Sequence, residues 1–251
     1  METILNLNNI HKSFGEKRIH QGVNFELHKG ESLGLLGGSG TGKSVLLRSI
    51  IGLEKIDSGK ILFHDKEVQG FTDELNLSKL RLKISYSFQS GALFDSLNVF
   101  DNIAYPLFEH TKLSYVEIQV KVAQVLKLID LEGIENLMPS DLSGGMQKRV
   151  GMARAMILDP EIILYDEPTA GLDPANIENV VSLMLKLKER GQSSILVTHD
   201  IPAAIRFCDR ILILIDRKIY FNGTVEEFTE SDDPNILKFA QGQAKEAHHA
   251  S

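Results

Sequence analysis

Residues 37–44 read Gly-Gly-Ser-Gly-Thr-Gly-Lys-Ser and fit the pattern G-x-x-x-x-G-K-[ST]. The apolar residues 32–36 are expected to form a short buried strand before this stretch, and residues 43–51 show the apolar spacing of a helix. Glycines let the backbone curl so that consecutive N–H groups point at phosphate oxygens, and a helix N-terminus adds the positive end of its dipole. The strand, loop and helix therefore predict a phosphate-binding loop in an α/β core, although a flexible glycine and serine loop fits the same residues.

The end of this loop carries the side chains that are expected to act on phosphate and metal. Lys43 is predicted to neutralise the β and γ phosphates of ATP, and Ser44 is predicted to place its hydroxyl on Mg²⁺. The nucleotide-binding residues expected from the loop are Gly37, Gly38, Ser39, Gly40, Thr41, Gly42, Lys43 and Ser44.

Two acidic residues, Asp166 and Glu167, follow a second apolar run at residues 162–165. In an open parallel sheet, ligands bind at the carboxyl ends of the strands. Asp166 is therefore predicted to hold Mg²⁺ through water, and Glu167 to polarise the water that attacks the γ phosphate. A solvated turn is the alternative explanation for two acids after a strand.

Composition limits the class of protein. The chain has 251 residues, of which 43% are hydrophobic, so it can bury one full-sized core. The formal net charge of -7, without a dense run of Lys and Arg, argues against a nucleic-acid partner. The single cysteine, Cys208, allows no intrachain disulfide, and the first residues lack the pattern of a secretory signal, so we expect a cytoplasmic protein. Because the apolar runs are far shorter than the roughly 20 residues that span a bilayer, a membrane role requires a partner.

Hydrophobic periodicity predicts the order of the elements. Apolar and polar positions alternate over the first thirty residues, which predicts antiparallel strands interrupted by a loop at residues 11–18. Residues 113–129 and 144–158 have the helical period, and strand patterns return at 162–165 and 194–197.

Capping and turn signals mark the last third of the chain. Asp173 and Pro174 are expected to start a helix as its N-cap and first residue. Residues 216–217 are expected to turn a hairpin, and Thr224 with Glu227 forms a capping box for a short final helix.

These elements predict one α/β domain over residues 1–251. Residues 1–89 and 159–223 are expected to form a catalytic core with an antiparallel β subdomain. Residues 90–158 are expected to form a helical subdomain, and residues 224–251 a C-terminal helix and tail.

Residues 142–147 read Leu-Ser-Gly-Gly-Met-Gln and resemble the LSGGQ signature of ATP-binding cassette (ABC) proteins. Met146 takes the place of the usual glutamine, which follows one position later. The resemblance implies the ABC ATPase fold, in which a P-loop NTPase (RecA-like) core carries an antiparallel β subdomain and a helical insertion. It also implies a homodimer closed by two ATP molecules, with Ser143, Gly144 and Gly145 at the γ phosphate held by the partner protomer. Ser143 is also suited to cap the helix that begins there.

Other elements of the family follow in the expected order over residues 4–223. Phe14 stands where the family stacks an aromatic ring on adenine, although core or hairpin packing is an equal alternative for a lone aromatic. Gln89 matches the glutamine that contacts Mg²⁺ or the attacking water and responds to the membrane subunit. His199 matches the histidine that contacts the γ phosphate, and residues 170–173 resemble the loop along the dimer interface.

One departure from the family concerns Val45, where a threonine hydroxyl commonly helps to hold the α phosphate. Val45 keeps its backbone N–H, so it stays among the expected nucleotide-binding residues, and we expect weaker nucleotide affinity at most. The resemblance thus assigns catalysis to Glu167, His199 and Gln89, and Mg²⁺ binding to Ser44, Asp166 and Gln89.

Residues 88–97, together with Asn102 and the Pro106-Leu107 pair, resemble the ATPases of Mla/Mce-type lipid transporters. The resemblance implies an integral-membrane permease, a lipid-binding Mce-domain protein and phospholipid transport between bacterial membranes. It places the chain at the cytoplasmic face of the inner membrane, attached through the permease. The apolar residues 92–94 next to Gln89 are suited to line a groove for a short permease helix, or to be buried in the helical subdomain.

Three other functions remain open at this point. One is the ATPase of an ABC importer or exporter for a different substrate. A second is an ABC protein that regulates a partner without transport, and the third is a P-loop kinase for a small molecule, against which the signature argues. If Glu167 is the catalytic base, Glu167→Gln is expected to trap the closed, ATP-filled dimer.

Overall fold

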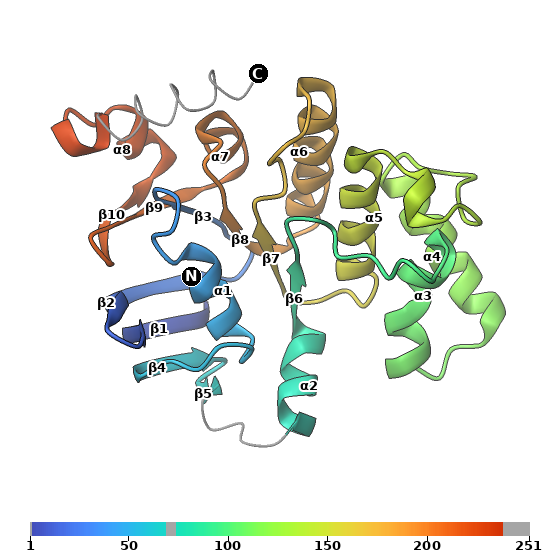
Figure 1. The fold of residues 1–251 in the computed structure, drawn as a ribbon, viewed down its shortest axis with the longest axis horizontal. Helices are drawn as coiled ribbons and strands as arrows, with labels where there is room; N and C mark the ends of the chain where they lie inside the picture. The colour runs from blue at the N-terminus through green and yellow to red at the C-terminus, as the bar shows by residue number, and fades with distance from the viewer. Residues whose placement is uncertain (1, 69–73, 238–251) are drawn as a thin grey trace.

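The structure is a computed structural model that describes residues 2–68 and 74–237. Its centre is a six-stranded sheet in the order β10-β9-β3-β8-β7-β6 (Figure 1). Neighbouring strands from β9 to β6 are parallel, while β10 pairs with β9 in an antiparallel hairpin. The strands are β3 (Ser32–Leu36), β6 (Ile84–Ser87), β7 (Ile162–Asp166), β8 (Ser193–Val197), β9 (Arg210–Ile215) and β10 (Lys218–Thr224). β3, β7 and β8 are buried at every position, which explains why they read as continuous apolar runs.

A second, antiparallel sheet has the order β2-β1-β4-β5. Its strands are β1 (Thr3–Phe14), β2 (Lys17–His28), β4 (Ser58–Phe63) and β5 (Lys66–Glu67). The loop predicted at residues 11–18 is wrong, because His11 pairs with Gln21 and Phe14 pairs with Lys17, so only a two-residue turn separates the strands. The polar residues that suggested a loop extend this ribbon, where backbone pairing does not require an apolar face.

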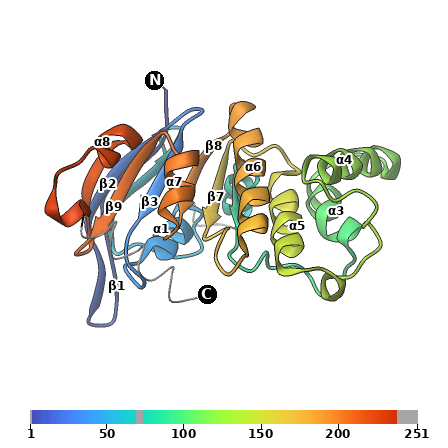
Figure 2. The ribbon, with the colours of Figure 1, turned by 90° about the horizontal axis from the view of Figure 1, so that it is seen from above.

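The helices fall into two groups. α1 (Lys43–Ile50), α2 (Glu74–Lys83), α6 (Pro174–Glu189), α7 (Ile201–Phe207) and α8 (Val225–Thr229) accompany the strands. A mostly helical region gathers at one end of the molecule, opposite the antiparallel sheet (Figure 2). It contains α3 (Val99–His110), α4 (Tyr115–Leu128), the 3₁₀ turn η2 (Pro139–Asp141) and α5 (Gly144–Met156). Among the described residues, no helix is both long enough and apolar enough to cross a bilayer.

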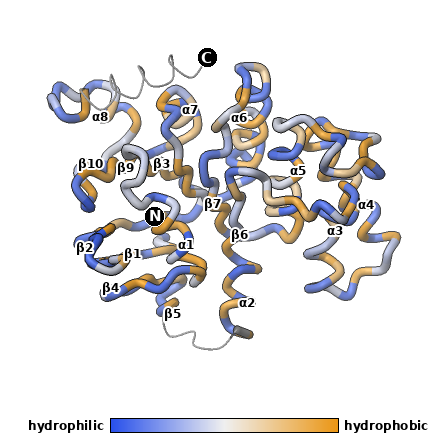
Figure 3. The backbone as a smooth tube through the Cα atoms, viewed as in Figure 1, coloured by the Kyte–Doolittle hydropathy of each residue, from blue (hydrophilic) through white to orange (hydrophobic). Residues whose placement is uncertain are grey.

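The central sheet separates two hydrophobic clusters, and Figure 3 shows the hydrophobic residues concentrated along β3, β8 and β7. Successive residues of one strand belong to opposite clusters, as expected from the two-residue period of a strand. On β7, Ile163 and Tyr165 pack with the helices α3 to α7, whereas Leu164 packs with α1 and the antiparallel sheet. The sheet therefore holds the phosphate loop and the helical region on one rigid support.

Several local predictions are confirmed. Asp173 accepts a hydrogen bond from the Asn176 N–H as the N-cap of α6, and Thr224 and Glu227 form the capping box of α8. The β9–β10 hairpin turns at residues 216–217, both of which have positive φ. Cys208 is buried, and burial raises the pKa of its thiol far above the usual range, so it is not a nucleophile.

α2 was not predicted from the sequence, and α3 was not predicted as an individual helix, although it lies within the helical subdomain predicted at residues 90–158. α2 has almost no amphipathic pattern, and α3 contains Pro106, which normally argues against a helix. The sequence shows no apolar pattern in residues 244–251, and these lie outside the described residues.

Candidate functional site

The carboxyl ends of four parallel strands meet at one edge of the central sheet. The phosphate loop follows β3, and Gln89 comes two residues after β6. Glu167 directly follows β7, and His199 comes two residues after β8. The structure thus gathers the groups predicted from four separate sequence stretches at the edge where open α/β sheets bind ligands.

The phosphate loop has a backbone that requires glycine. Gly42, the N-cap of α1, has φ 100°. A Cβ atom there would clash with Ile19 and come 2.8 Å from Nε2 of the buried His20, so strand β2 packs directly behind the loop. His20 also contacts the Gly42 carbonyl oxygen through Nε2 at 3.1 Å. The antiparallel sheet therefore braces the loop from behind.

Lys43 lies across the loop. Its Nζ donates hydrogen bonds to the carbonyl oxygens of Gly37 at 2.7 Å and Gly38 at 3.1 Å. Burial lowers the pKa of Lys43, and the nearby carboxylates of Glu167 and Asp166 act in the opposite direction. Within residues 2–68 and 74–237, no ion pair joins Lys43 to a carboxylate, so this buried lysine is suited to an anionic ligand such as phosphate.

Asp166 and Ser44, two of the residues predicted to hold Mg²⁺, are joined by a hydrogen bond. The Ser44 hydroxyl donates to Asp166 Oδ1 at 2.8 Å, and Asp166 is only 7% exposed. The Tyr86 hydroxyl donates to Asp166 Oδ2 at 2.5 Å, a contact that the sequence analysis missed. Burial, and then the hydrogen bond to Asp166, raise the pKa of Tyr86 far above its usual range, so the phenol remains a donor.

These oxygen groups fit Mg²⁺. This ion is typically held by one or two carboxylates together with substrate phosphates, and it prefers hard oxygen ligands. Asp166 and Ser44 supply a carboxylate and a hydroxyl beside the loop that would hold the phosphates. Gln89 is exposed at the same sheet edge and offers an amide oxygen.

Glu167 and His199 form a second bonded pair. His199 Nδ1 lies 2.9 Å from Glu167 Oε2, and the His199 backbone N–H donates to the same oxygen at 3.3 Å. The hydrogen bond that His199 donates to the Glu167 carboxylate is the main reason why the pKa of His199 is raised. Glu167 has φ 51°, a left-handed conformation that is rare for residues with a side chain and is typical of functional sites.

Lys148 of α5 points back toward this pair. Its Nζ donates a hydrogen bond to the Ala170 carbonyl oxygen, and burial lowers its pKa while the Glu167 charge acts against that shift. Lys148 was not predicted from the sequence as a site residue. Its position in α5 directly after the signature could have indicated a role near the ATP site. A lysine on a helix, however, is usually only a solvated side chain.

The signature residues lie at the start of α5. Ser143 is exposed and caps this helix by accepting a hydrogen bond from the Met146 N–H at 3.3 Å, so the capping prediction is confirmed. Gly144 is exposed, while Gly145 is buried against Asn176 of α6, where a Cβ atom would clash. Within the part of the chain that the structure describes, no hydrogen bond joins Ser143 to the phosphate loop of its own protomer.

Phe14 lies at the end of β1 and is 47% exposed, so core packing is the wrong explanation for it. Lys12 Nζ lies 4.5 Å from the centre of its ring. This ammonium group is held by Glu54 at 2.7 Å and by the Lys55 carbonyl oxygen at 2.6 Å. Phe14 is therefore a supported ring with exposed surface, as base stacking requires.

The loop after Gln89 is attached to α5. Arg154 donates hydrogen bonds to the carbonyl oxygens of Gly91 at 3.1 Å and Ala92 at 2.7 Å, and its guanidinium lies 5.0 Å from the Phe94 ring centre. Ala92 and Phe94 are exposed, whereas Leu93 is half-buried and packs on the core. Exposure of Ala92 and Phe94 fits a groove for a partner helix, whereas Leu93 fits burial in the helical subdomain. Each of the two predicted explanations for residues 92–94 therefore holds for part of the run.

A groove of about 380 Å³ opens beside this loop, between α2, α3 and α5. Its walls include three aromatic rings close to Gln89 in sequence or space, those of Tyr86, Phe88 and Phe94. Tyr105 and Pro106 of α3 and Arg154 of α5 complete the opposite side.

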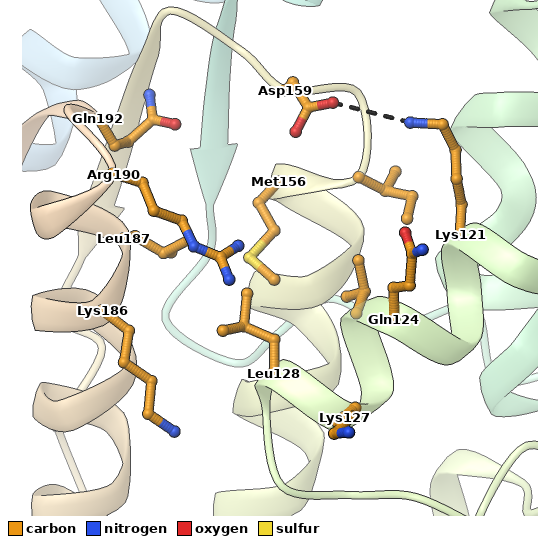
Figure 4. Close-up of a pocket in the computed structure, with 12 residues that line it drawn as sticks. Lys121, Gln124, Lys127, Leu128, Met156, Asp159, Lys186, Leu187, Arg190 and Gln192 are labelled. Atoms are coloured by element: carbon orange, nitrogen blue, oxygen red, sulfur yellow. Dashed lines mark ion pairs between the residues drawn. The ribbon is translucent and has the colours of Figure 1, made fainter.

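A second cavity, of about 730 Å³, lies between α4, α5 and α6, and Figure 4 shows its lining. Lys121, Lys186 and Arg190 are on its walls and Met156 is on its floor, with an ion pair of 3.7 Å from Lys121 to Asp159. This cavity contains none of the predicted site residues, and it is separate from the nucleotide edge.

The fold, the phosphate loop and the contacts of Ser44 with Asp166 and of Glu167 with His199 define a P-loop nucleotide-binding protein. The sequence profile of the family described as ABC transporter matches residues 20–170. The protein TRIGALACTOSYLDIACYLGLYCEROL 3, chloroplastic, of Arabidopsis thaliana is 40% identical over 96% of this chain and 74% of its own length. The intermembrane phospholipid transport system ATP-binding protein MlaF of Haemophilus influenzae is 35% identical over 97% of this chain and 92% of its own length.

Among solved structures, a dimeric post-hydrolysis state of the ATP-binding cassette MJ0796 bound to ADP and Pi superposes with a TM-score of 0.81. It is 33% identical and covers 88% of this chain and 99% of its own. The chain therefore belongs to the ABC transporter family, as a nucleotide-binding, ATP-hydrolysing subunit.

Proposed function

We propose that this chain binds and hydrolyses ATP as a homodimer and thereby drives phospholipid movement through a membrane permease. The observation that carries the ATPase part is the pair of contacts at the sheet edge, Ser44 with Asp166 and Glu167 with His199. The similarity to MlaF over 97% of this chain supports phospholipid as the substrate.

The residues at the sheet edge would share the work of hydrolysis. The loop N–H groups of residues 37–45 and Lys43 would bind the phosphates. Ser44, Asp166 and Gln89 would hold Mg²⁺, which supplies positive charge at the γ phosphate when it is bound.

Glu167 would accept a proton from the water as the water oxygen attacks the γ phosphorus and ADP leaves. His199 would hold Glu167 in place through the 2.9 Å contact, and the opposite side of its half-exposed ring would face the γ phosphate. The left-handed backbone of Glu167 supports this role, because such strained conformations cluster at functional sites.

The second half of each ATP site would come from the partner protomer. Ser143, Gly144 and Gly145 lie at an exposed helix N-terminus, which favours anions. Because Gly145 is packed against Asn176, near the loop at residues 170–173, signature and interface loop would move together. Phe14 would stack on the adenine.

The groove beside Gln89 is our proposed permease site, which would place the chain at the cytoplasmic face of the inner membrane. Phe94 and Tyr105 are 44% and 42% exposed there, and a groove with exposed aromatic rings is suited to a short helix with apolar anchors. Arg154 ties the groove to the Gln89 loop, so closure at the nucleotide would reach the permease through that loop. A lipid-binding Mce-domain protein would complete the complex.

The test is to purify the full chain from its native membrane in mild detergent and to identify the accompanying proteins and lipids. We expect a permease, an Mce-domain protein and bound phospholipid, with ATP hydrolysis by the complex. A different permease without lipid would keep the transport function and contradict the substrate. Absence of any membrane protein, with ATP-dependent dimers still forming, would favour the regulatory ABC protein.

A further inference from the structure

Tyr86 is a side chain that the proposed mechanism does not use. It lies near the carboxyl end of β6 and pairs with Leu164 of β7, two residues before Asp166. This register brings its ring alongside the last residues of β7. The phenol is therefore placed by the parallel pairing of β6 with β7.

The two carboxylate oxygens of Asp166 have separate hydroxyl donors. Ser44 donates to Oδ1 at 2.8 Å, and Tyr86 donates to Oδ2 at 2.5 Å. Ser44 is itself a candidate Mg²⁺ ligand, so its hydroxyl has a second task. Tyr86 is not itself a candidate Mg²⁺ ligand, and its hydroxyl interacts with Arg48 as well as with the carboxylate. Asp166 is too deeply buried for solvent to replace that donor easily.

The same side chain is part of the groove wall. The Tyr86 and Phe88 rings are 4.5 Å apart between centroids, and both line the groove together with Phe94 and Tyr105. One side of Tyr86 thus contacts the candidate metal ligand, while its other side forms the surface where the permease would bind. A change in the shape of the groove would act directly on the ring that holds Asp166.

We propose that Tyr86 is a positioning residue that orients Asp166 for Mg²⁺ and links occupation of the groove to the metal site. The proposal rests on the proposed function, because it takes Asp166 as a metal-holding residue. Hydrogen-bonding partners of metal-binding carboxylates commonly contribute about 10-fold or more to metal affinity.

The first test compares Tyr86→Phe with Tyr105→Phe in the isolated full chain. Each variant loses one hydroxyl from the same groove, but only Tyr86 contacts Asp166. Mn²⁺ binding in the presence of a non-hydrolysable ATP analogue is measured by electron paramagnetic resonance. We expect Tyr86→Phe to weaken Mn²⁺ binding about 10-fold and Tyr105→Phe to leave it unchanged.

Nucleotide affinity in EDTA provides the folding control and is expected to match the parent in both variants. Parental Mn²⁺ affinity in Tyr86→Phe, or an equal loss in Tyr105→Phe, overturns the positioning role. Asp166→Asn distinguishes this failure from a failure of the proposed function. If Asp166→Asn also binds Mn²⁺ normally, the metal role of Asp166 is wrong.

The link to the groove is tested in the purified permease complex. Mn²⁺ affinity with the same ATP analogue is compared between the free chain and the complex for the parent and Tyr86→Phe. We expect the permease to shift the affinity in the parent and to have no such effect in Tyr86→Phe. A shift that persists in Tyr86→Phe, or no shift in the parent, overturns the link.

Discussion

The two regions that would meet around one ATP differ in how far each is complete within a single chain. At the phosphate loop, Lys43, Ser44 and Glu167 all contact other side chains or carbonyl groups of the same protomer. At the signature turn, Ser143 contacts only the backbone of its own helix among the hydrogen bonds described, and it is exposed.

This difference indicates which part of the ATP site one chain would supply by itself and which part would depend on a second protomer. The phosphate-loop region is preorganised, so a single chain would bind the phosphates and hold the proposed general base. The signature region lies at a helix N-terminus that has no described hydrogen bond to the phosphate loop of its own chain. Its contribution to an ATP site therefore depends on a second protomer. A substitution in one of these regions should disrupt that region and leave the other intact.

The largest effect is expected from Glu167→Gln. Loss of the base should reduce ATP hydrolysis about 1000-fold, because general base catalysis contributes roughly that factor. ATP binding and dimer formation should persist, as measured by nucleotide titration and light scattering. Glu161→Gln, at the opposite end of β7 and paired with Lys83, is the matched control and should hydrolyse at the parental rate. Parental hydrolysis by Glu167→Gln would contradict the assignment.

Gly42→Ala should destabilise the phosphate-loop region itself. The alanine would have to adopt φ 100°, and its Cβ would clash with Ile19. We therefore expect a loss of about 3 kcal/mol in the free energy of unfolding. Gly40→Ala, at φ 74° with no atom within 4 Å of a Cβ, should cost about 1 kcal/mol. Urea unfolding measures both, and equal losses would show that packing against β2 is unimportant.

Ser143→Arg should break only the signature region. In the Glu167→Gln background we expect each chain to bind ATP normally, while the ATP-dependent dimer weakens by at least about 30-fold, the loss of one interface hot spot of ~2 kcal/mol. Sedimentation measures the dimer. Ser58→Arg, an exposed position on β4, serves as the control and should dimerise like the parent. Weakened ATP binding to single chains of Ser143→Arg would place Ser143 in the wrong half of the site.

The smallest effect concerns the proton on His199. Because its pKa is raised in the folded chain, the His199–Glu167 pair stabilises the fold fully below the unfolded pKa of about 6.5. That contribution is lost as the pH rises through the raised folded value. In an NMR titration of the imidazole, we expect Glu167→Gln to move the His199 pKa downward. An unchanged value would show that Glu167 does not hold this ring.

The sequence predicts the phosphate loop and the strand-end carboxylates because their chemistry depends on local order: a strand, a tight turn and a helix start within ten residues. It also predicts Ser143 and Asp173 as helix caps, since a cap bonds to its own backbone. These features need no information about distant parts of the chain.

The features that were missed depend on contacts between distant segments. Tyr86 contacts Asp166, 80 positions later in the chain, and Asn176 packs on Gly145 from another helix. The extension of β1 through Lys12 was missed for a similar reason. A lysine suggests a loop until its partner Glu54 and the Lys55 carbonyl are known to bury it. Long-range pairing of this kind leaves no periodic pattern in the sequence.

Strand β2 connects Phe14 to the phosphate loop and fixes the distance between them. Phe14 ends β1, β2 begins three residues later at Lys17, and His20 on that strand touches Gly42. The span from the aromatic ring to the loop is thus set by strand geometry, at about 3.3 Å per residue, and not by a flexible linker. If Phe14 stacks on the base and the loop binds the phosphates, as proposed, these strands fix the distance between the two ends of the bound nucleotide.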